Sequence, residues 1–355
     1  MGRVMTDPLA DVKSLLPSLR RRAMVLDQIG AWPEEDLALL SGMGAMRWAV
    51  PQSANGAGWT PLQLYLGYEM LASGSMSVAL ILSQRDSAVG LLEGALPSPL
   101  AIDLLAKLAD DRIFATIGIA QLTTSRQGGP PALRATPKAG GWQLDGVVPW
   151  ATGAGKAEWV IVGAATDDNR QLLIALQSSL AGVTAHPSLP LVALRSSWTG
   201  QITCNAVRIE PSTVLRGPID KVLPGRKNSL PLGQAFLAMG LCRSGLELIA
   251  EHRSAGARAA LGRFETQFNE LRSEILALSQ PGRETEATNA SSRIRGQCSD
   301  LTLRVMHAAV ALYKGAALLA DHPAQRLARE AMFLLVWSCP APVIECTVDL
   351  LSEAR

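Results

Sequence analysis

The spacing of hydrophobic residues changes twice along the chain. Between residues 8 and 105, apolar side chains recur at helical intervals, as Leu9 and Val12 illustrate. Over residues 113–215, short apolar runs alternate with clusters of Gly, Pro, Asn and Asp, which is typical of strands joined by turns. Long amphipathic patterns of helical period return over residues 232–355. The pattern therefore predicts helices, then strands, then helices.

This order favours an α+β protein whose helices and strands are segregated. We expect an N-terminal helical domain at residues 1–112, a central antiparallel β domain at 113–217 and a C-terminal four-helix bundle at 218–355. In the middle part, residues 142–148 alternate in the manner of a strand and residues 159–164 form a β-branched run. The bundle is predicted from four long helical segments: residues 232–261, 264–278, 291–319 and 323–336.

Composition excludes several classes of function. Hydrophobic residues make up 48% of the chain and charged residues 18%, so we expect an ordered protein with a sizeable core. The 33 basic and 31 acidic residues leave a net charge of +2, which gives no basic field for nucleic acid. No apolar run is long enough to predict a membrane span, and the first residues show no secretory signal. Five scattered Cys and four scattered His predict no metal site and favour a reducing, cytoplasmic location.

Five short motifs follow one another along the chain. They are Val-Pro-Gln-Ser-Ala-Asn-Gly-Ala-Gly at residues 50–58, Gly-Val-Val-Pro-Trp-Ala-Thr at 146–152 with Gly-Lys-Ala-Glu-Trp at 155–159, Leu-Arg-Ser-Ser-Trp-Thr at 194–199 with Val-Arg-Ile at 207–209, Arg-Ala-Ala-Leu-Gly at 258–262, and His-Pro-Ala-Gln-Arg-Leu-Ala-Arg-Glu-Ala at 322–331. In this order and spacing, the chain resembles the acyl-CoA dehydrogenase family over about residues 32–351. The resemblance implies FAD, bound between the β domain and the bundle and partly covered by a second subunit.

The resemblance also implies which side chains contact the flavin. Trp150 stands where the family has a Trp that packs on the isoalloxazine ring, and Thr152 where a Thr bonds near N5. Ile119, Gln121 and Ser125 lie on the segment that matches the family's flavin-binding Thr-Glu loop. The residues alone leave another reading open, in which Trp150 covers the core and Thr152 ends a strand.

A second subunit completes the flavin site in the family. Arg258 matches the arginine that reaches the partner's FAD diphosphate, and Gly315 matches a glycine of the family's second contact loop. Trp337 matches the aromatic residue beside the catalytic position, and we expect it to contact the cofactor. The resemblance thus implies a homodimer or homotetramer, although Arg258 also reads as an ordinary exposed helix residue.

The catalytic base of the family is missing. Dehydrogenation of an acyl thioester needs a carboxylate that takes the α-proton, yet the position of the usual Glu is Ser338. The other position where relatives place the base is Gly233. We do not expect Ser338 to act as a base, because a hydroxyl of ordinary pKa cannot replace a carboxylate here. Asp86 is the best carboxylate candidate that remains, with Glu69 behind it, and an ordinary helix charge is the alternative reading for both.

These observations predict an acyl-CoA dehydrogenase-like, FAD-dependent oxidoreductase. Its substrate would be an acyl thioester such as acyl-CoA, or a related small molecule, and electrons would pass to a separate partner. Two alternatives stay open. One is a monooxygenase of the same fold that uses reduced flavin and needs no carboxylate at residue 338. The other is a non-catalytic structural or binding member of the family.

Overall fold

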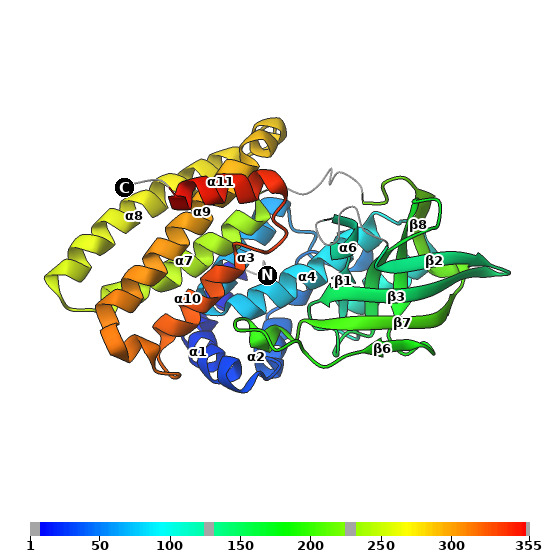
Figure 1. Ribbon diagram of the computed structural model, residues 1–355, viewed down its shortest axis with the longest axis horizontal. Coiled ribbons are helices and arrows are strands. Elements are labelled where there is room, and N and C mark those ends of the chain that lie inside the picture. The colour runs from blue at the N-terminus through cyan, green and yellow to red at the C-terminus, as the bar shows by residue number, and fades with distance from the viewer. Residues whose placement is uncertain (1–7, 124–130, 224–231, 353–355) are drawn as a thin grey trace, which may run out of the picture.

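The computed structural model describes residues 8–123, 131–223 and 232–352. Figure 1 shows a helical body joined side by side to a β region, so that the molecule is longer than it is wide. This arrangement confirms the predicted α+β fold, with N-terminal helices, a central β region and a C-terminal helical bundle.

The N-terminal helices begin where sequence signals place them. Thr60 and Gln63 form a reciprocal capping box at the start of α3, and Pro61 occupies its first turn. Ser75 caps α4, which is apolar around most of its circumference and is therefore buried along most of its length. The elements of this part are α1 (Pro8–Ile29), α2 (Glu34–Gly42), η1 (Ala45–Arg47), η2 (Gln52–Ala54), α3 (Pro61–Gly74), α4 (Met76–Glu93) and α5 (Pro99–Ala109).

The β region is one eight-stranded sheet in the order β6-β7-β3-β2-β4-β5-β8, with β1 paired to β4. Most pairs are antiparallel, as predicted, but β1 and β2 each run parallel to β4. Parallel neighbours need a long connection, and the chain between β1 and β4 supplies one by forming β2 and β3. The elements are β1 (Ala115–Gly118), α6 (Ala120–Thr123), β2 (Leu133–Lys138), β3 (Gly141–Ala151), β4 (Trp159–Ala165), β5 (Gln171–Gln177), β6 (Val183–Ala185), η3 (Arg195–Ser197), β7 (Gly200–Ile209), η4 (Pro211–Thr213) and β8 (Val214–Ile219).

The C-terminal helices form the predicted bundle, but their boundaries differ from those expected. The segment expected at residues 232–261 is divided, because the chain turns at His252 and Ser254 caps a new helix by accepting a hydrogen bond from the Ala257 amide. This new helix continues without a break through the segment expected at 264–278, and the helix expected at 291–319 spans Glu284–Tyr313. The elements are α7 (Gly233–Glu251), α8 (Ala255–Leu278), α9 (Glu284–Tyr313), η5 (Lys314–Leu318), α10 (Pro323–Phe333) and α11 (Ala341–Ser352).

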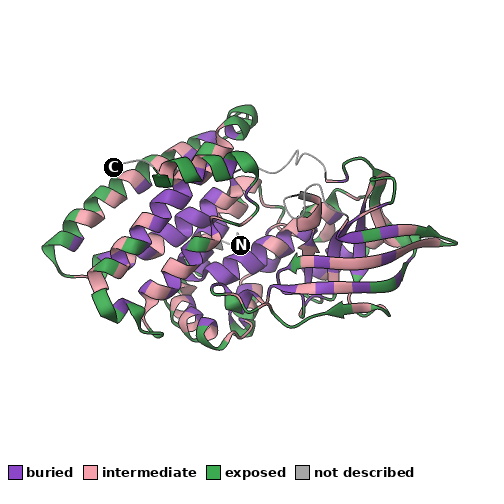
Figure 2. Ribbon diagram, viewed as in Figure 1, coloured by how far each residue is buried: buried purple, intermediate pink, exposed green. Residues whose placement is uncertain are grey.

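One hydrophobic core joins the N-terminal helices to the bundle. Leu71 of α3, Phe236 of α7 and Val305 of α9 belong to the same buried cluster. Helix α4 contacts both α7 and strand β1, so it lies between the bundle and the sheet. Figure 2 shows the buried segments running through the middle of the helical body and along α4 toward the sheet. The helices and the sheet are therefore held in one packing arrangement.

Candidate functional site

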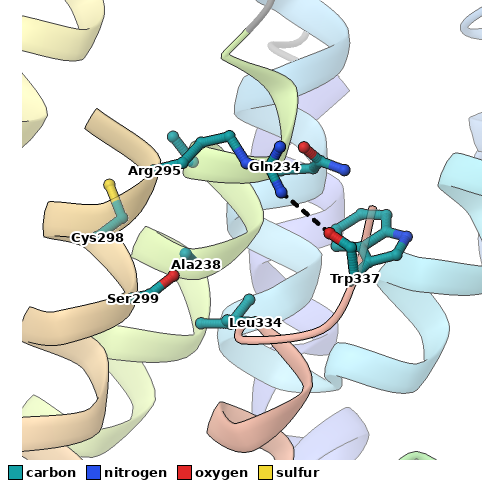
Figure 3. Close-up of a pocket in the computed structure, with 8 residues that line it drawn as sticks. Gln234, Ala238, Arg295, Cys298, Ser299, Leu334 and Trp337 are labelled. Carbon is teal, nitrogen blue, oxygen red and sulfur yellow. Dashed lines mark hydrogen bonds between the residues drawn. The ribbon is translucent and has the colours of Figure 1, made fainter. Parts of the chain in front are cut away.

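The loop after α10 carries Ser338, the position at which the resemblance predicts a catalytic Glu. Ser338 is exposed and has φ +47°, a left-handed backbone conformation that is uncommon outside Gly. Just before it, the Trp337 ring stacks on Phe333 with centroids 5.2 Å apart. Arg295 of α9 donates hydrogen bonds to the carbonyl oxygens of Trp337 (2.9 Å) and Ser338 (3.0 Å). Figure 3 shows the first of these bonds. A single guanidinium therefore fixes the backbone of this loop.

Arg295 brings a positive charge to this loop. The guanidinium also lies 3.7 Å from the Cys339 Sγ atom, and no carboxylate of a described residue forms an ion pair with it. Burial lowers the pKa of Arg295, but an arginine remains charged in proteins. Burial also raises the pKa of the Cys339 thiol, against the opposing effect of Arg295, so Cys339 is a neutral thiol at pH 7. The loop thus has a cation where the resemblance places an anion.

A small cavity of about 10 Å³ opens beside Arg295. Figure 3 shows that Arg295 and Cys298 come from α9 and Gln234 from α7, with Trp337 closing one side. The volume admits about one water molecule. Its lining residues are Gln234, Ala235, Ala238, Arg295, Cys298, Ser299, Leu334 and Trp337.

The alternative base position is closed by an aromatic ring. A Cβ atom on Gly233 would lie 2.8 Å from the Tyr65 ring, a distance that real side chains essentially never show. Tyr65 is itself packed on Phe236, with ring centroids 5.6 Å apart. A carboxylate at residue 233 would therefore require Tyr65 to move.

Asp86 lies in the core among partners of its own. Tyr68 donates a hydrogen bond of 2.6 Å to one carboxylate oxygen, and Arg85 donates one of 2.8 Å to the other. Arg85 also donates to the carbonyl of Leu108 on α5, at 2.7 Å. Burial raises the pKa of Asp86, and Arg85 opposes that rise. This arrangement ties α3, α4 and α5 together and leaves both Asp86 oxygens occupied.

The predicted flavin-binding wall lies at the end of β3. The Trp150 side chain is 47% exposed, which is unusual for so large an apolar group, while Thr152 two residues later is buried. The Thr152 and Thr199 hydroxyl oxygens are 3.3 Å apart, and the Thr199 and Ser197 hydroxyl oxygens are 2.8 Å apart. The structure thus places an open indole face next to a short chain of buried hydroxyls.

Gln121 offers a second polar group on the sheet. Its amide nitrogen donates to the carbonyls of Gly118 (3.0 Å) and Gly163 (2.6 Å). Its amide oxygen is buried and has no hydrogen-bond partner among the described residues. Such an oxygen fits a ligand that brings an N–H donor, as the flavin pyrimidine does. Ile119 is half-buried against the neighbouring apolar cluster, and Ser125 lies outside the described residues.

Arg258 and Gly315 lie apart from this wall. Both residues are exposed, and Arg258 donates a 2.8 Å hydrogen bond to the carbonyl of Arg253. Figure 1 places the start of α8 and the end of α9 at the end of the bundle remote from the sheet. Within one chain they therefore do not join Trp150 and Thr152.

Sequence reasoning missed two parts of the site. Arg295 belongs to none of the five motifs. The available signal was its spacing: Arg295 lies one helical turn before Ser299, so both residues are on the same face of the helix, and that face lines the cavity. Thr199 is part of a motif, and its spacing from Ser197 was the available signal for the hydroxyl chain.

The described residues hold no group of three or more His, Cys, Asp or Glu side chains that could bind a metal ion. Within the same residues, no helix is long and apolar enough to cross a membrane. The described cysteines are all free thiols.

Comparisons with known proteins support the resemblance. No model of a known protein family matches the chain. The chain is 22% identical over 335 residues to the probable acyl-CoA dehydrogenase fadE25 of Mycobacterium leprae, covering 88% of this chain and 85% of that protein. The butyryl-CoA dehydrogenase of Megasphaera elsdenii superimposes with a TM-score of 0.81 at 19% identity, over 99% of this chain and 100% of that one. FMN-bound TdsC of Paenibacillus sp. A11-2 does so with a TM-score of 0.82 at 16% identity, over 97% and 96%.

These similarities confirm the acyl-CoA dehydrogenase-like identification that the motifs predicted. At these identities the superpositions establish the fold, and TdsC, described as a dibenzothiophene monooxygenase, shows that the fold is shared with a monooxygenase.

Proposed function

We propose that this acyl-CoA dehydrogenase-like protein is a flavin-dependent oxidoreductase that acts on an acyl thioester or a related small molecule. The observation that carries the proposal is the open face of Trp150 beside the buried hydroxyls of Thr152 and Thr199. The unpartnered oxygen of Gln121 adds to it. An exposed indole, hydroxyl donors and an amide acceptor are the groups that a planar, hydrogen-bonding ring system requires.

The cofactor proposed is FAD, which when bound supplies two-electron redox chemistry at its ring. On this chain, Trp150 provides the apolar surface on which a planar ring packs, and Thr152 provides a hydroxyl that can donate to it. Gln121 can accept a hydrogen bond from a ring N–H through its free oxygen. Because the Thr152 hydroxyl is held near Thr199, its orientation is set before a ligand arrives.

A second subunit completes the site in this proposal. Arg258 and Gly315 are too far from Trp150 to serve the same flavin, yet their exposure leaves them free to reach a neighbouring one. A guanidinium is well suited to a diphosphate because its planar fork donates two parallel hydrogen bonds. We therefore propose a homodimer or homotetramer that passes electrons to a separate partner and works in the cytoplasm.

The chemistry that follows flavin binding does not use a carboxylate at the usual place. Ser338 carries a hydroxyl, and Tyr65 occupies the space that a side chain at residue 233 would need. The Asp86 carboxylate is engaged by Tyr68 and Arg85. Abstraction of an α-proton from a thioester by one of these three positions is therefore the weakest part of the dehydrogenase assignment.

This lack of a base favours a second candidate, a monooxygenase that uses reduced flavin and oxygen. Such chemistry requires a dry pocket and a bound flavin, and it does not require a carboxylate beside the substrate. The fold is compatible with it, since TdsC is described as a dibenzothiophene monooxygenase.

An anaerobic reduction assay separates the candidates. The purified protein is saturated with FAD, and its absorbance at about 450 nm, typical of oxidised flavin, is followed on addition of a panel of acyl-CoAs. Bleaching by an acyl-CoA supports the dehydrogenase. Unchanged absorbance under anaerobic conditions, together with substrate-dependent oxygen consumption in a separate aerobic assay with a flavin reductase and NADH, supports the monooxygenase. A protein that takes up no FAD is the non-catalytic member, and that result contradicts the proposal.

A further inference from the structure

The cavity between α7 and α9 is lined by an arginine, Arg295, that has no carboxylate partner among the described residues. Two carboxylates lie close enough to influence the neighbouring Cys298, namely Glu274 and Glu69. Each of these carboxylates pairs with an arginine other than Arg295. Arg293 donates a hydrogen bond to Glu274 at 2.6 Å, and Arg272 donates one to Glu69 at 2.6 Å. Both of these carboxylates are thus paired, whereas Arg295 forms no ion pair with a carboxylate of a described residue.

Arg295 also retains hydrogen-bonding capacity. Its two terminal nitrogens donate hydrogen bonds to the carbonyls of Trp337 and Ser338, whereas its Nε–H donates to no atom of a described residue. Gln234, on the facing helix, likewise makes no side-chain hydrogen bond within the described part of the chain. Neither the Arg295 guanidinium nor the Gln234 amide is fully buried, so water can reach both side chains in the free protein, and an oxygen atom of a ligand can take the place of that water.

The cavity has the size for one such acceptor. A volume of about 10 Å³ admits one oxygen-sized group, and Ser299 adds a hydroxyl to its lining. A guanidinium, an amide and a hydroxyl thus belong to the residues that line the cavity. Preorganised donors of this kind stabilise a negatively charged oxygen much better than a neutral one.

We propose that this cavity is an oxyanion pocket, in which Arg295 and Gln234 bind a negatively charged oxygen of the substrate. The inference rests on the proposed function, and it names the substrate class: an organic acid, or a compound with an ionised enol or phenol, rather than a neutral thioester. In an ionised enol or phenol the negative charge is already present, so no carboxylate base is needed at Ser338. An organic acid would be held by its carboxylate, which does not by itself remove an α-proton. The arginine takes the place of the missing Glu by charge reversal.

The test compares two probes that differ in charge and hardly in shape, acetate and acetamide. Calorimetric titration of the full-length protein at constant low ionic strength measures the dissociation constant of each. The pocket predicts that acetate binds at least about tenfold more tightly than acetamide, which is the effect of one charge-assisted hydrogen bond. Equal affinities, or no acetate binding, overturn the inference.

Variants test which side chains cause the preference for acetate over acetamide. Arg295→Gln is expected to reduce the preference to less than about threefold, whereas Arg295→Lys keeps the charge and should retain most of it. The matched control is Arg293→Gln, two residues away on the same helix but outside the cavity and paired with Glu274, which should leave the preference unchanged. A preference that survives Arg295→Gln, or that disappears in Arg293→Gln, refutes the pocket.

Far-UV circular dichroism shows whether each variant folds. If Arg295→Gln does not fold, Gln234→Leu decides, since it removes the second donor and should weaken acetate binding severalfold without changing acetamide binding. The visible spectrum of the same samples keeps the two proposals apart. A colourless protein that prefers acetate retains the pocket and refutes the flavin assignment, whereas a yellow protein without the preference refutes the pocket alone.

Discussion

The end of β3 and the loop after α10 have diverged to different degrees. At the first, Trp150 and Thr152 match the residues that the resemblance places beside a flavin, and the Trp150 side chain is 47% exposed. At the second, Ser338 stands where the resemblance predicts a catalytic Glu, and Arg295 donates hydrogen bonds to the loop carbonyls. On our proposal, cofactor binding and proton abstraction are separable demands on one fold, and this chain keeps residues for the first and lacks a carboxylate for the second.

The largest effect is expected on the free energy of unfolding when Asp86 is replaced. If Asp86 were a catalytic base, this chain would not have lost proton abstraction, and the comparison of the two regions would fail. Asp86→Ala leaves Arg85 buried without its carboxylate, and such a loss typically costs about 3–5 kcal/mol of unfolding free energy. Urea denaturation measures it. The double variant Arg85→Met, Asp86→Leu should recover much of the loss, because it removes both charges from the core. A destabilisation below about 1 kcal/mol, together with loss of substrate turnover, would instead make Asp86 a base.

The next effect concerns the wall at β3. Replacing Trp150 and Thr152 together by Ala removes the apolar surface and the hydroxyl donor, so we expect flavin affinity to fall by about 10- to 100-fold. A spectral titration with FAD measures it. Trp142→Ala on the same strand is the control and should bind flavin normally, provided that it folds. Unchanged affinity in the double variant contradicts the proposed wall.

A smaller effect is expected at the start of α7. Gly233→Glu forces a side chain against Tyr65 and should lower the unfolding free energy by about 1–3 kcal/mol. The control is Gly262→Glu on α8, where nothing lies within 4 Å of the new Cβ atom. Thermal denaturation compares the two variants. If Gly233→Glu is as stable as the control, Tyr65 does not close this base position.

The smallest effect tests the loop itself. Ser338→Glu restores the family's residue, but Arg295 would pair with the new carboxylate and lower its basicity. We therefore expect only slow flavin reduction by acyl-CoA, and faster reduction when Arg295→Gln is added to the same protein. Stopped-flow absorbance under anaerobic conditions measures both rates. Faster reduction with Arg295 present than without it would show that the arginine assists the base.

Much of the fold was readable from periodicity and caps. The helix–strand–helix order follows from the change in hydrophobic spacing, and Thr60 with Gln63 marks the start of α3. The parallel pairing of β1 with β4 was not predicted, because pairing partners distant in sequence leave no local pattern. The turn at His252 was missed because the apolar period continues on either side of it.

Some residues of the candidate site could be predicted from the sequence, and others could not. Trp150 and Thr152 stand in a motif, so a sequence can show them. Arg295 and Gln234 lie on different helices and meet only through packing, and the partners of Asp86 likewise come from three helices. Whether a charged residue is a base, a ligand for substrate or part of the core depends on such contacts, which no spacing rule contains.

Equilibrium binding of FAD to the purified protein tests the central claim most directly. The account predicts saturable binding of about one FAD per chain, with a change in the visible spectrum as the ring packs against Trp150. A protein that remains colourless after dialysis against excess FAD, while folded by circular dichroism, would contradict it.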